Sequence, residues 1–285
     1  MCGIVGIAYS DRNHMVEASI IKSMCDLIIH RGPDDEGIYI NKNVGLGFRR
    51  LSIIDLTTGH QPISNENSTI WVTLNGEIYN YLDLRTELIS KGHIFKSQSD
   101  TEVLVHLYEE YGDQFLTKLR GMFGLALFDS VNQKLLIARD RVGIKPLFYY
   151  FDRGKFLYGS ELKAIKSSVD NLEIDNASIV DYFSYGYIYG EKSIYRDIHK
   201  LLPGHYLSLN LLNFDFSINR YWELKTDLDY SKTHDEWIEA IQFKLKETVS
   251  SHMISDVPLG AFLSGGVDSS TIVELMTEIS NNPVE

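Results

Sequence analysis

The strand-like segments of this chain come in runs, and that grouping restricts its fold most. Segments rich in Ile, Val, Leu and aromatic residues predict strands at 2–9, 36–41, 44–54, 69–75, 122–129, 134–140, 147–151 and 155–160. Apolar residues at helical spacing predict helices over 16–29, 79–91 and 101–119. Because strands and helices do not alternate one for one, the pattern predicts an α+β fold with antiparallel sheets over roughly the first 210 residues.

The sequence changes character beyond this region. A polar, acidic stretch covers residues 213–234, and apolar residues four apart predict a helix over 234–254. The apolar segment VPLGAFL (257–263) predicts a short strand, and a second helix is expected after the glycine-rich segment SGGVDSS (264–270). We therefore predict two domains, residues 2–213 and residues 214–285.

Composition excludes several classes of protein. The 27 Lys and Arg against 39 Asp and Glu give a formal net charge of −12, which argues against binding nucleic acid through its phosphates. Two cysteines outside any CxxC pair cannot form a disulfide framework, so a cytoplasmic location is expected. No apolar run is long enough to span a membrane. The histidines are scattered without a metal-ligand pattern, so no metal site is expected.

One of the two cysteines stands at position 2, in the opening segment MCGIVG. Removal of the initiator Met before a small residue would leave Cys2 with a free α-amine beside its thiol. That amine has an ordinary pKa of about 7.7–8.0 and is partly neutral near pH 7. It can then generate the thiolate, which is the attacking form of cysteine. These residues alone also fit the alternative that Cys2 only begins a β-strand.

The segment SGGVDSS has the composition of an anion-binding loop before a helix. Gly265 and Gly266 let phosphate oxygens approach backbone N–H groups, and the helix N-terminus adds partial positive charge. Asp268 is a ligand type suited to Mg²⁺ bridging phosphates. The lysine of a Walker A loop is absent, and the alternative is an ordinary helix N-cap.

Together these segments resemble those of a known family. SGGVDSS resembles the pyrophosphate-binding loop of the ATP pyrophosphatases, and its pairing with MCGIVG is that of the glutamine-hydrolysing asparagine synthetases. Further segments agree in order: HRGPDDEG (30–37), FRRLSIID (48–55), LNGEIYNY (74–81), SDTEVL (99–104), GMFGLALFD (121–129) and ARDRVGIKPLFYY (138–150). The resemblance implies an N-terminal-nucleophile sandwich, with two antiparallel sheets between helix layers, followed by the first elements of an α/β ATP-pyrophosphatase domain.

For the first domain the resemblance implies a class II glutamine amidotransferase, in which Cys2 attacks the side-chain amide of glutamine. The Asn75 side chain and the Gly76 backbone N–H are then expected to stabilise the tetrahedral oxyanion. Arg50 matches the residue that binds the α-carboxylate, and Glu77 with Asp100 matches the acidic side facing the α-ammonium. The residues expected to bind glutamine are Arg50, Leu51, Ile53, Asn75, Gly76, Glu77 and Asp100.

For the second domain the resemblance implies the use of ATP and Mg²⁺ to adenylate aspartate. Ammonia from the first site would attack this intermediate to give asparagine, AMP and pyrophosphate. The residues expected to bind ATP are Leu263, Ser264, Gly265, Gly266, Val267, Asp268, Ser269 and Ser270. We expect this domain to be incomplete here, so that the chain hydrolyses glutamine without making asparagine alone.

Alternatives remain open for function. A related amidotransferase of the same architecture would use another carboxylate acceptor, a sugar or a peptide, and a third alternative is a non-catalytic partner protein. The resemblance also allows a homodimer.

Several other residues are expected to be structural. Arg49 points to the strand face opposite Arg50, His30 and Arg31 form a turn, and Cys25 is a buried packing thiol. The Tyr- and Gly-rich stretch 181–195 is expected to be a packed aromatic loop.

Overall fold

The computed structural model describes residues 2–280. These residues divide into two compact units. The first comprises the chain up to Ser52 and Thr57–Glu223, and the second comprises Ile53–Leu56 and the chain from Leu224 onward. The compact first unit runs on to Glu223. The boundary between two domains expected at residues 213 and 214 stays a prediction.

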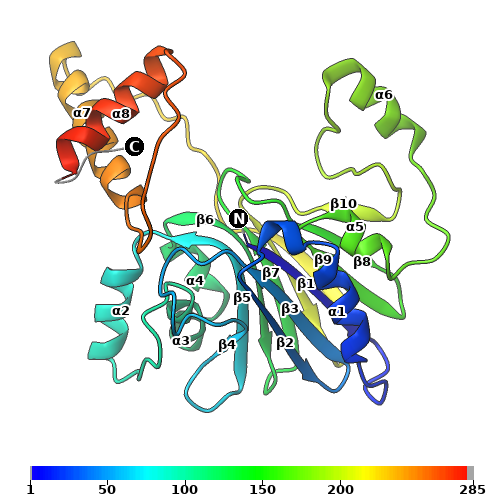
Figure 1. The fold of residues 1–285 in the computed structure, drawn as a ribbon. Helices are drawn as coiled ribbons and strands as arrows, with labels where there is room; N and C mark the ends of the chain where they lie inside the picture. The colour runs from blue at the N-terminus through cyan, green and yellow to red at the C-terminus, as the bar shows by residue number, and fades with distance from the viewer. Residues whose placement is uncertain (1, 281–285) are drawn as a thin grey trace. The chain divides into compact units, whose positions relative to one another are not determined.

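Two six-stranded sheets, antiparallel throughout, form the centre of the first unit (Figure 1). In spatial order, the first sheet contains β10 (Ile198–Lys200), β8 (Phe148–Phe151), β9 (Lys155–Gly159), β1 (Gly3–Tyr9), β3 (Val44–Arg50) and β2 (Asp35–Asn41). The second contains β12 (Asp215–Arg220), β11 (His205–Asn210), β7 (Lys134–Arg139), β6 (Gly121–Asp129), β5 (Ile70–Ile78) and β4 (Ile63–Ser64).

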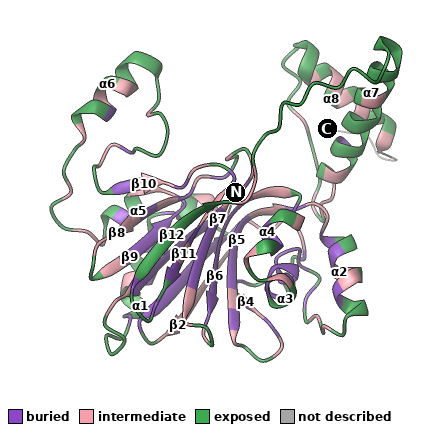
Figure 2. Cartoon of the chain, turned by 180° about the vertical axis from the view of Figure 1, so that it is seen from behind, coloured by how far each residue is buried: buried purple, intermediate pink, exposed green. Residues whose placement is uncertain are grey.

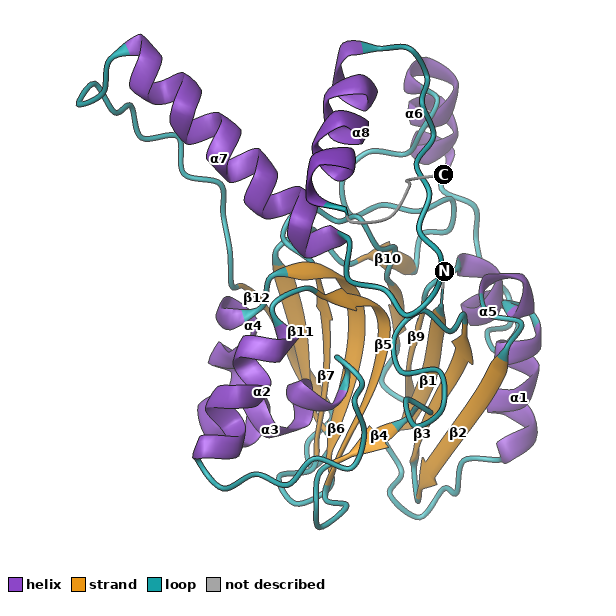
Figure 3. Ribbon diagram, turned by 60° about the vertical axis from the view of Figure 1, so that its left-hand side comes forward, coloured by secondary structure: helices purple, strands orange, loops and turns teal. Residues whose placement is uncertain are grey.

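Helices cover the outer faces of both sheets (Figure 3). Helices α1 (Ala18–Asp26) and α5 (Leu162–Lys166) lie on the first sheet, and the 3₁₀ turn η1 (Ile29–Arg31) follows α1. Helices α2 (Tyr81–Ser90), α3 (Glu102–Tyr111) and α4 (Phe115–Lys118) lie beside the second sheet, with the 3₁₀ turn η2 (Gly112–Gln114) before α4. The result is a four-layer arrangement of helices, sheet, sheet and helices.

Strand β1 shows why the layers hold together. Alternate side chains of a strand point to opposite faces, so Ile4 and Ala8 join the core between the two sheets. Val5 and Ile7 instead join a second core, which α1 and α5 complete. Because β1 is buried on both faces, it reads as a continuous apolar segment. This sandwich of two antiparallel sheets confirms the predicted fold class.

Three predicted elements differ from the structure in their ends. The helix expected over 101–119 is broken into α3, η2 and α4, because Gly112 adopts a φ of 52° that ends α3. The helix expected over 16–29 ends at Asp26. The strand expected over 44–54 ends at Arg50, where its pairing with β2 and β1 stops.

The stretch 181–195 is not packed, so that prediction is wrong. Its first residues form the end of α6 (Asn176–Tyr185), and the rest is loop. Phe183, Tyr185 and Tyr189 are 83%, 68% and 68% exposed, and α6 is mostly green in Figure 2. Periodicity marks aromatic residues as apolar, but only the tertiary neighbours decide whether they are covered.

The described part of the second unit is helical, with α7 (His234–His252) and α8 (Val267–Ile279). The predicted helix over 234–254 is confirmed, and Thr233 begins it with a capping box to Glu236. The strand expected at 257–263 is wrong, because within residues 224–280 there is no other strand to which it can hydrogen-bond. No helix formed by residues 2–280 combines the length and apolar character that crossing a membrane requires.

Candidate active site

Cys2 precedes β1 and lies beside the end of β3. Antiparallel pairing places Gly3 opposite Arg49, so the backbone just after β3 comes next to Cys2. The Leu51 N–H donates to the Cys2 Sγ at 3.3 Å, and the thiol is 3.5 Å from the Leu51 carbonyl oxygen. An N–H that donates to sulfur favours the thiolate, which is the nucleophilic form.

Arg31 holds the backbone of Cys2, a contact that sequence reasoning missed. Its Nε donates to the Cys2 carbonyl oxygen at 2.9 Å, while its Nη1 donates to Glu161 at 3.1 Å. His30 is a hydrogen-bond partner of the same Glu161 carboxylate at 2.8 Å. These residues do form the expected turn, η1. The segment HRGPD also orients Cys2.

The thiol itself is not intrinsically acidic in this environment. Burial raises the pKa of Cys2, the hydrogen bond from Leu51 lowers it, and the nearby Glu77 carboxylate raises it. The thiol pKa therefore lies above its ordinary value, and a base near the sulfur is needed to form the thiolate at neutral pH. Cys25, in contrast, is fully buried in the core under α1, where burial raises its pKa to about 12. This burial matches its predicted packing role.

Asn75 and Gly76 lie near the end of β5, where they pair with Gly124 and Phe123 of β6. Asn75 is completely buried, and its Nδ2 donates to Ser160 Oγ at 3.4 Å. Ser160 is fixed in turn, because its Oγ accepts from the Ile4 N–H at 3.0 Å. The Asn75 Oδ1 has no hydrogen-bond partner among residues 2–280. A buried acceptor left unpaired is costly, which fits a site that receives a ligand carrying N–H groups.

Gly76 allows β5 to approach β6 more closely than any other residue would permit. A Cβ added there would lie 2.0 Å from the Met122 carbonyl oxygen and 2.7 Å from the Phe123 Cα. Both are backbone atoms of β6, so the clash cannot be relieved by a side-chain rotation. The backbone N–H of Gly76 is thereby held in a fixed position.

We expect Gly76→Ala to lower the free energy of unfolding by about 1–3 kcal/mol, since overpacking forces the backbone to shift. Urea denaturation measures this change. Gly159→Ala is the matched control, because a Cβ in β9 would meet its nearest atom at an ordinary 3.5 Å. Equal stability of the two variants would contradict the close approach of β5 and β6.

Two acidic side chains form a coupled pair at this end of the second sheet. Burial, and then the neighbouring Asp100, raises the pKa of Glu77 to about 8. Burial raises the pKa of Asp100 to about 6, although its Oδ2 accepts a hydrogen bond from the Ile78 N–H at 2.8 Å. Two carboxyl groups this close resist ionising together. A ligand cation placed between them would let both ionise.

Positive charges balance this acidic pair. Arg50 is 4% exposed, and its charge lowers the pKa of Glu77. Lys145, also 4% exposed, likewise lowers the pKa of Glu77. Burial lowers the pKa of Lys145 itself, and the charges of Glu77 and Cys2 oppose this only in part. Lys145 was missed as a site residue, although it lies in the quoted segment ARDRVGIKPLFYY. These couplings link Cys2 and Arg50 with the Glu77–Asp100 pair in one site.

The remaining predicted site residues belong to the second unit. Ile53 groups with the second unit, where its carbonyl oxygen accepts a hydrogen bond from the Asp256 N–H at 3.0 Å. Its contact with glutamine stays a prediction. In the glycine loop, Gly265 has a φ of 79° and Gly266 is the N-cap of α8, with Ser264 and Ser269 hydroxyls 2.9 Å apart. The backbone of Gly265 thus adopts the left-handed conformation expected of an anion-binding turn.

The fold defines a class of protein: an N-terminal-nucleophile sandwich of two antiparallel sheets between helices. A family model described as glutamine amidotransferase domain matches residues 1–222, and one described as asparagine synthase matches residues 240–285. The chain therefore belongs to the glutamine amidotransferase domain family.

Similar proteins agree with this assignment. Asparagine synthetase (glutamine-hydrolyzing) 1 of Bacillus subtilis is 38% identical over 98% of this chain and 44% of its own length. Amidase ChyE of Penicillium rubens is 33% identical over 95% of this chain and 40% of its own length. A solved structure titled glutamine phosphoribosylpyrophosphate amidotransferase from B. subtilis shares the fold, with a TM-score of 0.55 and 18% identity over 100% of this chain and 65% of that one. The chain spans less than half the length of these two curated relatives.

Proposed function

We propose that the first unit hydrolyses glutamine to glutamate and ammonia, with Cys2 as the nucleophile. The observation that carries the proposal is the Cys2 thiol itself, which accepts a hydrogen bond from the Leu51 N–H and lies near enough to Glu77 and Asp100 for their charges to raise its pKa. Removal of Met1 would give Cys2 a free α-amine, and this amine is the base that the raised pKa of the thiol requires.

The reaction follows from these groups. The amine takes the thiol proton, and the sulfur attacks the δ-carbon of glutamine to form a tetrahedral oxyanion. The Asn75 side-chain N–H and the Gly76 backbone N–H stabilise this negative charge. The C–N bond breaks as the protonated amine returns its proton to the leaving group, which releases ammonia and leaves a thioester on Cys2. Water, activated by the same amine, hydrolyses the thioester to glutamate.

Recognition of free glutamine uses the charged side chains of the site. The Arg50 guanidinium can donate hydrogen bonds to both oxygens of the α-carboxylate. The Glu77–Asp100 pair accepts the α-ammonium, which supplies the cation that lets both carboxyl groups ionise.

Glutamine affinity should therefore increase by about 50-fold as the pH rises from about 6 to about 8. The cause is the raised pKa of Glu77, whose ionised form is needed to bind the ammonium. Calorimetry on the Cys2→Ser variant, which binds without turnover, measures the dissociation constant and the protons released. Glu77→Gln should remove most of this pH dependence. A glutamine affinity of the Cys2→Ser variant that does not change with pH would contradict the recognition scheme.

The raised pKa values of Glu77 and Asp100 also make the stability of the folded chain depend on pH. Because the pKa values of both groups lie above their ordinary values, the folded chain holds protons that the unfolded chain loses. The contribution of this pair to stability is therefore full below about pH 4 and is lost as the pH rises to about 8.

We propose further that the chain is the N-terminal portion of an ATP-dependent asparagine synthetase. The glycine loop before α8, a helix of 13 residues, would bind the phosphates of ATP with Mg²⁺, with Asp268 in its first turn as a metal ligand. Aspartate adenylated there would receive the ammonia. A different carboxylate acceptor is the second candidate, since one of the similar proteins is named an amidase.

The experiment for the first unit is a glutaminase assay on the purified chain, with glutamate and ammonia measured in equal amounts. Failure to release ammonia from glutamine would refute the proposal. The carboxylate that accepts the ammonia is identified with the full-length gene product, by measuring which carboxylate supports pyrophosphate release from ATP. The expected homodimer and cytoplasmic location stay predictions, and light scattering tests the former.

A further inference from the structure

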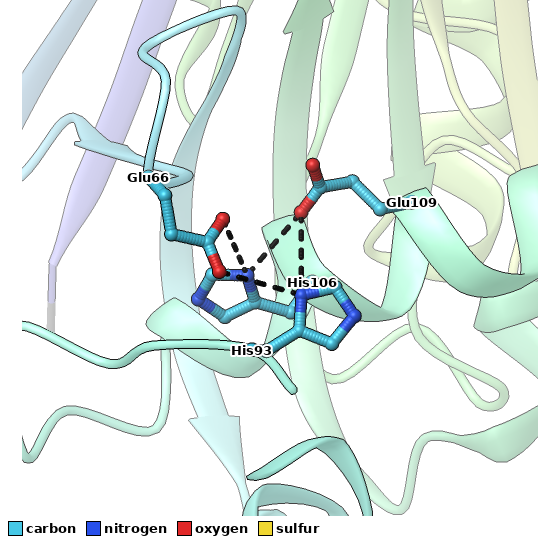
Figure 4. A group of neighbouring side chains, drawn as sticks. All are labelled: Glu66, His93, His106 and Glu109. Carbon is cyan, nitrogen blue, oxygen red and sulfur yellow. Dashed lines mark hydrogen bonds and ion pairs between the residues drawn. The ribbon is translucent and has the colours of Figure 1, made fainter. Parts of the chain in front are cut away.

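Four side chains that are far apart in the sequence meet beside α3 in the first unit (Figure 4). Glu66 lies in the turn between β4 and β5, His93 lies between α2 and α3, and His106 and Glu109 lie on α3 itself. One nitrogen or carboxylate oxygen from each lies within 4.8 Å of all the others. The two histidines, scattered in the sequence, thus lie together in the fold. The expectation of no metal site stays a prediction.

The distances between the facing atoms follow a common pattern. The His106 Nδ1 lies 3.3 Å from Glu109 Oε2 and 3.5 Å from Glu66 Oε2. The His93 Nδ1 lies 3.5 Å from Glu66 Oε1 and 3.7 Å from Glu109 Oε2. Most of these separations are too long for good hydrogen bonds, which cluster near 2.9 Å. These four separations are close to the ligand–ligand separation of about 3.4 Å that follows from tetrahedral zinc with bonds of about 2.0–2.1 Å. The two Glu66 distances involve different oxygens, and with one atom from each residue the separations reach up to 4.8 Å, so the side chains would close in on the ion.

We propose that Glu66, His93, His106 and Glu109 bind one divalent transition-metal ion, with zinc preferred. Imidazole nitrogen and carboxylate oxygen are both zinc ligands, and two of each in a tetrahedron suit this ion better than Mg²⁺ or Ca²⁺, which prefer six or more oxygens. No residue of the glutamine site takes part.

Each ligand is oriented by a second interaction, as is usual around metals. The Glu109 Oε1 accepts a hydrogen bond from Asn65 Nδ2 at 2.8 Å, which leaves Oε2 facing the histidines. The Glu66 Oε1 accepts from the Ile94 N–H at 2.9 Å.

The second nitrogen of each imidazole also faces a carboxylate. His93 Nε2 is 3.3 Å from Glu110 Oε1, and His106 Nε2 is 3.8 Å from Glu102 Oε1. The buried His106 Nε2 makes no closer hydrogen bond within residues 2–280. When Nδ1 binds a metal, Nε2 carries the ring proton and points to this carboxylate. Carboxylate–histidine–metal arrangements of this kind fix the tautomer that binds.

Charge also favours a cation at this position. Four carboxylates surround the two imidazoles, namely Glu66, Glu102, Glu109 and Glu110. Two lysines are nearby: Lys91 is 2.9 Å from Glu110, and Lys96 contacts the Glu66 carbonyl oxygen at 3.3 Å. With neutral imidazoles the cluster is left with two negative charges, which one divalent ion neutralises.

The metal would join three segments of the first unit. It would tie the β4–β5 turn and the loop after α2 to α3, whose N-cap residue Thr101 follows Asp100 directly. The same loop is held by Glu102, which accepts hydrogen bonds from the Lys96 and Ser97 N–H groups at 2.7 Å each. The role expected of the ion is structural, because it stabilises the loop that leads to Asp100.

The test is metal binding by the full chain, carried in the Cys2→Ser background so that the partly buried Cys2 thiol cannot bind zinc. After bound metal is removed with a chelator and the chain is dialysed against zinc, we expect mass spectrometry to show one zinc ion per chain. The melting temperature should rise by about 5–10 °C at a free zinc concentration one hundred times the dissociation constant. Cobalt should give the intense visible absorption of a tetrahedral site, without the near-ultraviolet band of a thiolate ligand.

Substitutions of the proposed ligands test which side chains bind the ion. His93→Gln and Glu109→Gln should each weaken zinc binding by at least about 100-fold, since a ligand is lost. His60→Gln is the matched control, because His60 also pairs with one carboxylate, Asp35, but is 67% exposed. The melting temperature in chelator shows that each variant folds. No zinc binding by the parent chain, or equal binding by all three variants, would overturn the proposal.

Discussion

Cys2→Ser should lose glutamine hydrolysis by about 10⁴- to 10⁶-fold in kcat, as enzymes do when the nucleophile is removed. The hydroxyl is a far weaker nucleophile than a thiolate at neutral pH. The variant should still fold, because Cys2 precedes β1 and its side chain is only partly buried. Ammonia release from glutamine, with thermal unfolding measured in parallel, checks both parts of this expectation.

The second cysteine provides the matched control. Cys25 lies on α1 in the core formed with α5 and the first sheet, and burial raises its pKa to about 12. Cys25→Ala should lower stability by creating a small cavity, with kcat retained. If Cys25→Ala abolished hydrolysis while Cys2→Ser retained it, the assignment of the nucleophile would be wrong.

Asn75→Ala should lower kcat by about 10²–10³-fold, with a smaller change in KM. The reason is that its side-chain N–H stabilises negative charge that develops only in the transition state. Asn75 is placed for this purpose, because it is completely buried and is hydrogen-bonded to Ser160 beside the start of β1. Steady-state kinetics on the purified variant give kcat and KM separately.

Another buried asparagine separates this effect from loss of stability. Asn43 is 3% exposed and donates a hydrogen bond to the Tyr9 carbonyl oxygen at 2.6 Å, at the far end of β1. Asn43→Ala should destabilise the fold and leave kcat almost unchanged. A kcat of Asn75→Ala close to that of Asn43→Ala would contradict the oxyanion role.

The sandwich was predictable because the apolar pattern of each strand is visible in its own local sequence. β1 is apolar on both faces and is buried on both, as its sequence indicates. Features that depend on distant neighbours were not predictable. The strand expected at 257–263 has no pairing partner in the part of the second unit that the structure describes, and Gly112 ends α3 where apolar spacing alone continues the helix.

The residues of the candidate site also fall into a group that the sequence predicts and a group that it does not. Family motifs mark Cys2, Arg50 and the Asn75–Glu77 segment directly. Ser160 and Arg31 orient the site across 85 and 29 residues of sequence, and neither carries a local signal for that role. His93 and His106 likewise look unrelated in the sequence, because a loop between α2 and α3 must fold back before they share two carboxylates.

Intact mass spectrometry of the purified chain, before and after treatment with a diazo-ketone analogue of glutamine, tests the central claim most directly. We predict a mass without the initiator Met, followed by a single covalent addition that maps to Cys2. Free glutamine should protect against the addition. Retention of Met1, or a free Cys2 that does not react, would contradict the assignment of Cys2 as a glutamine-directed nucleophile.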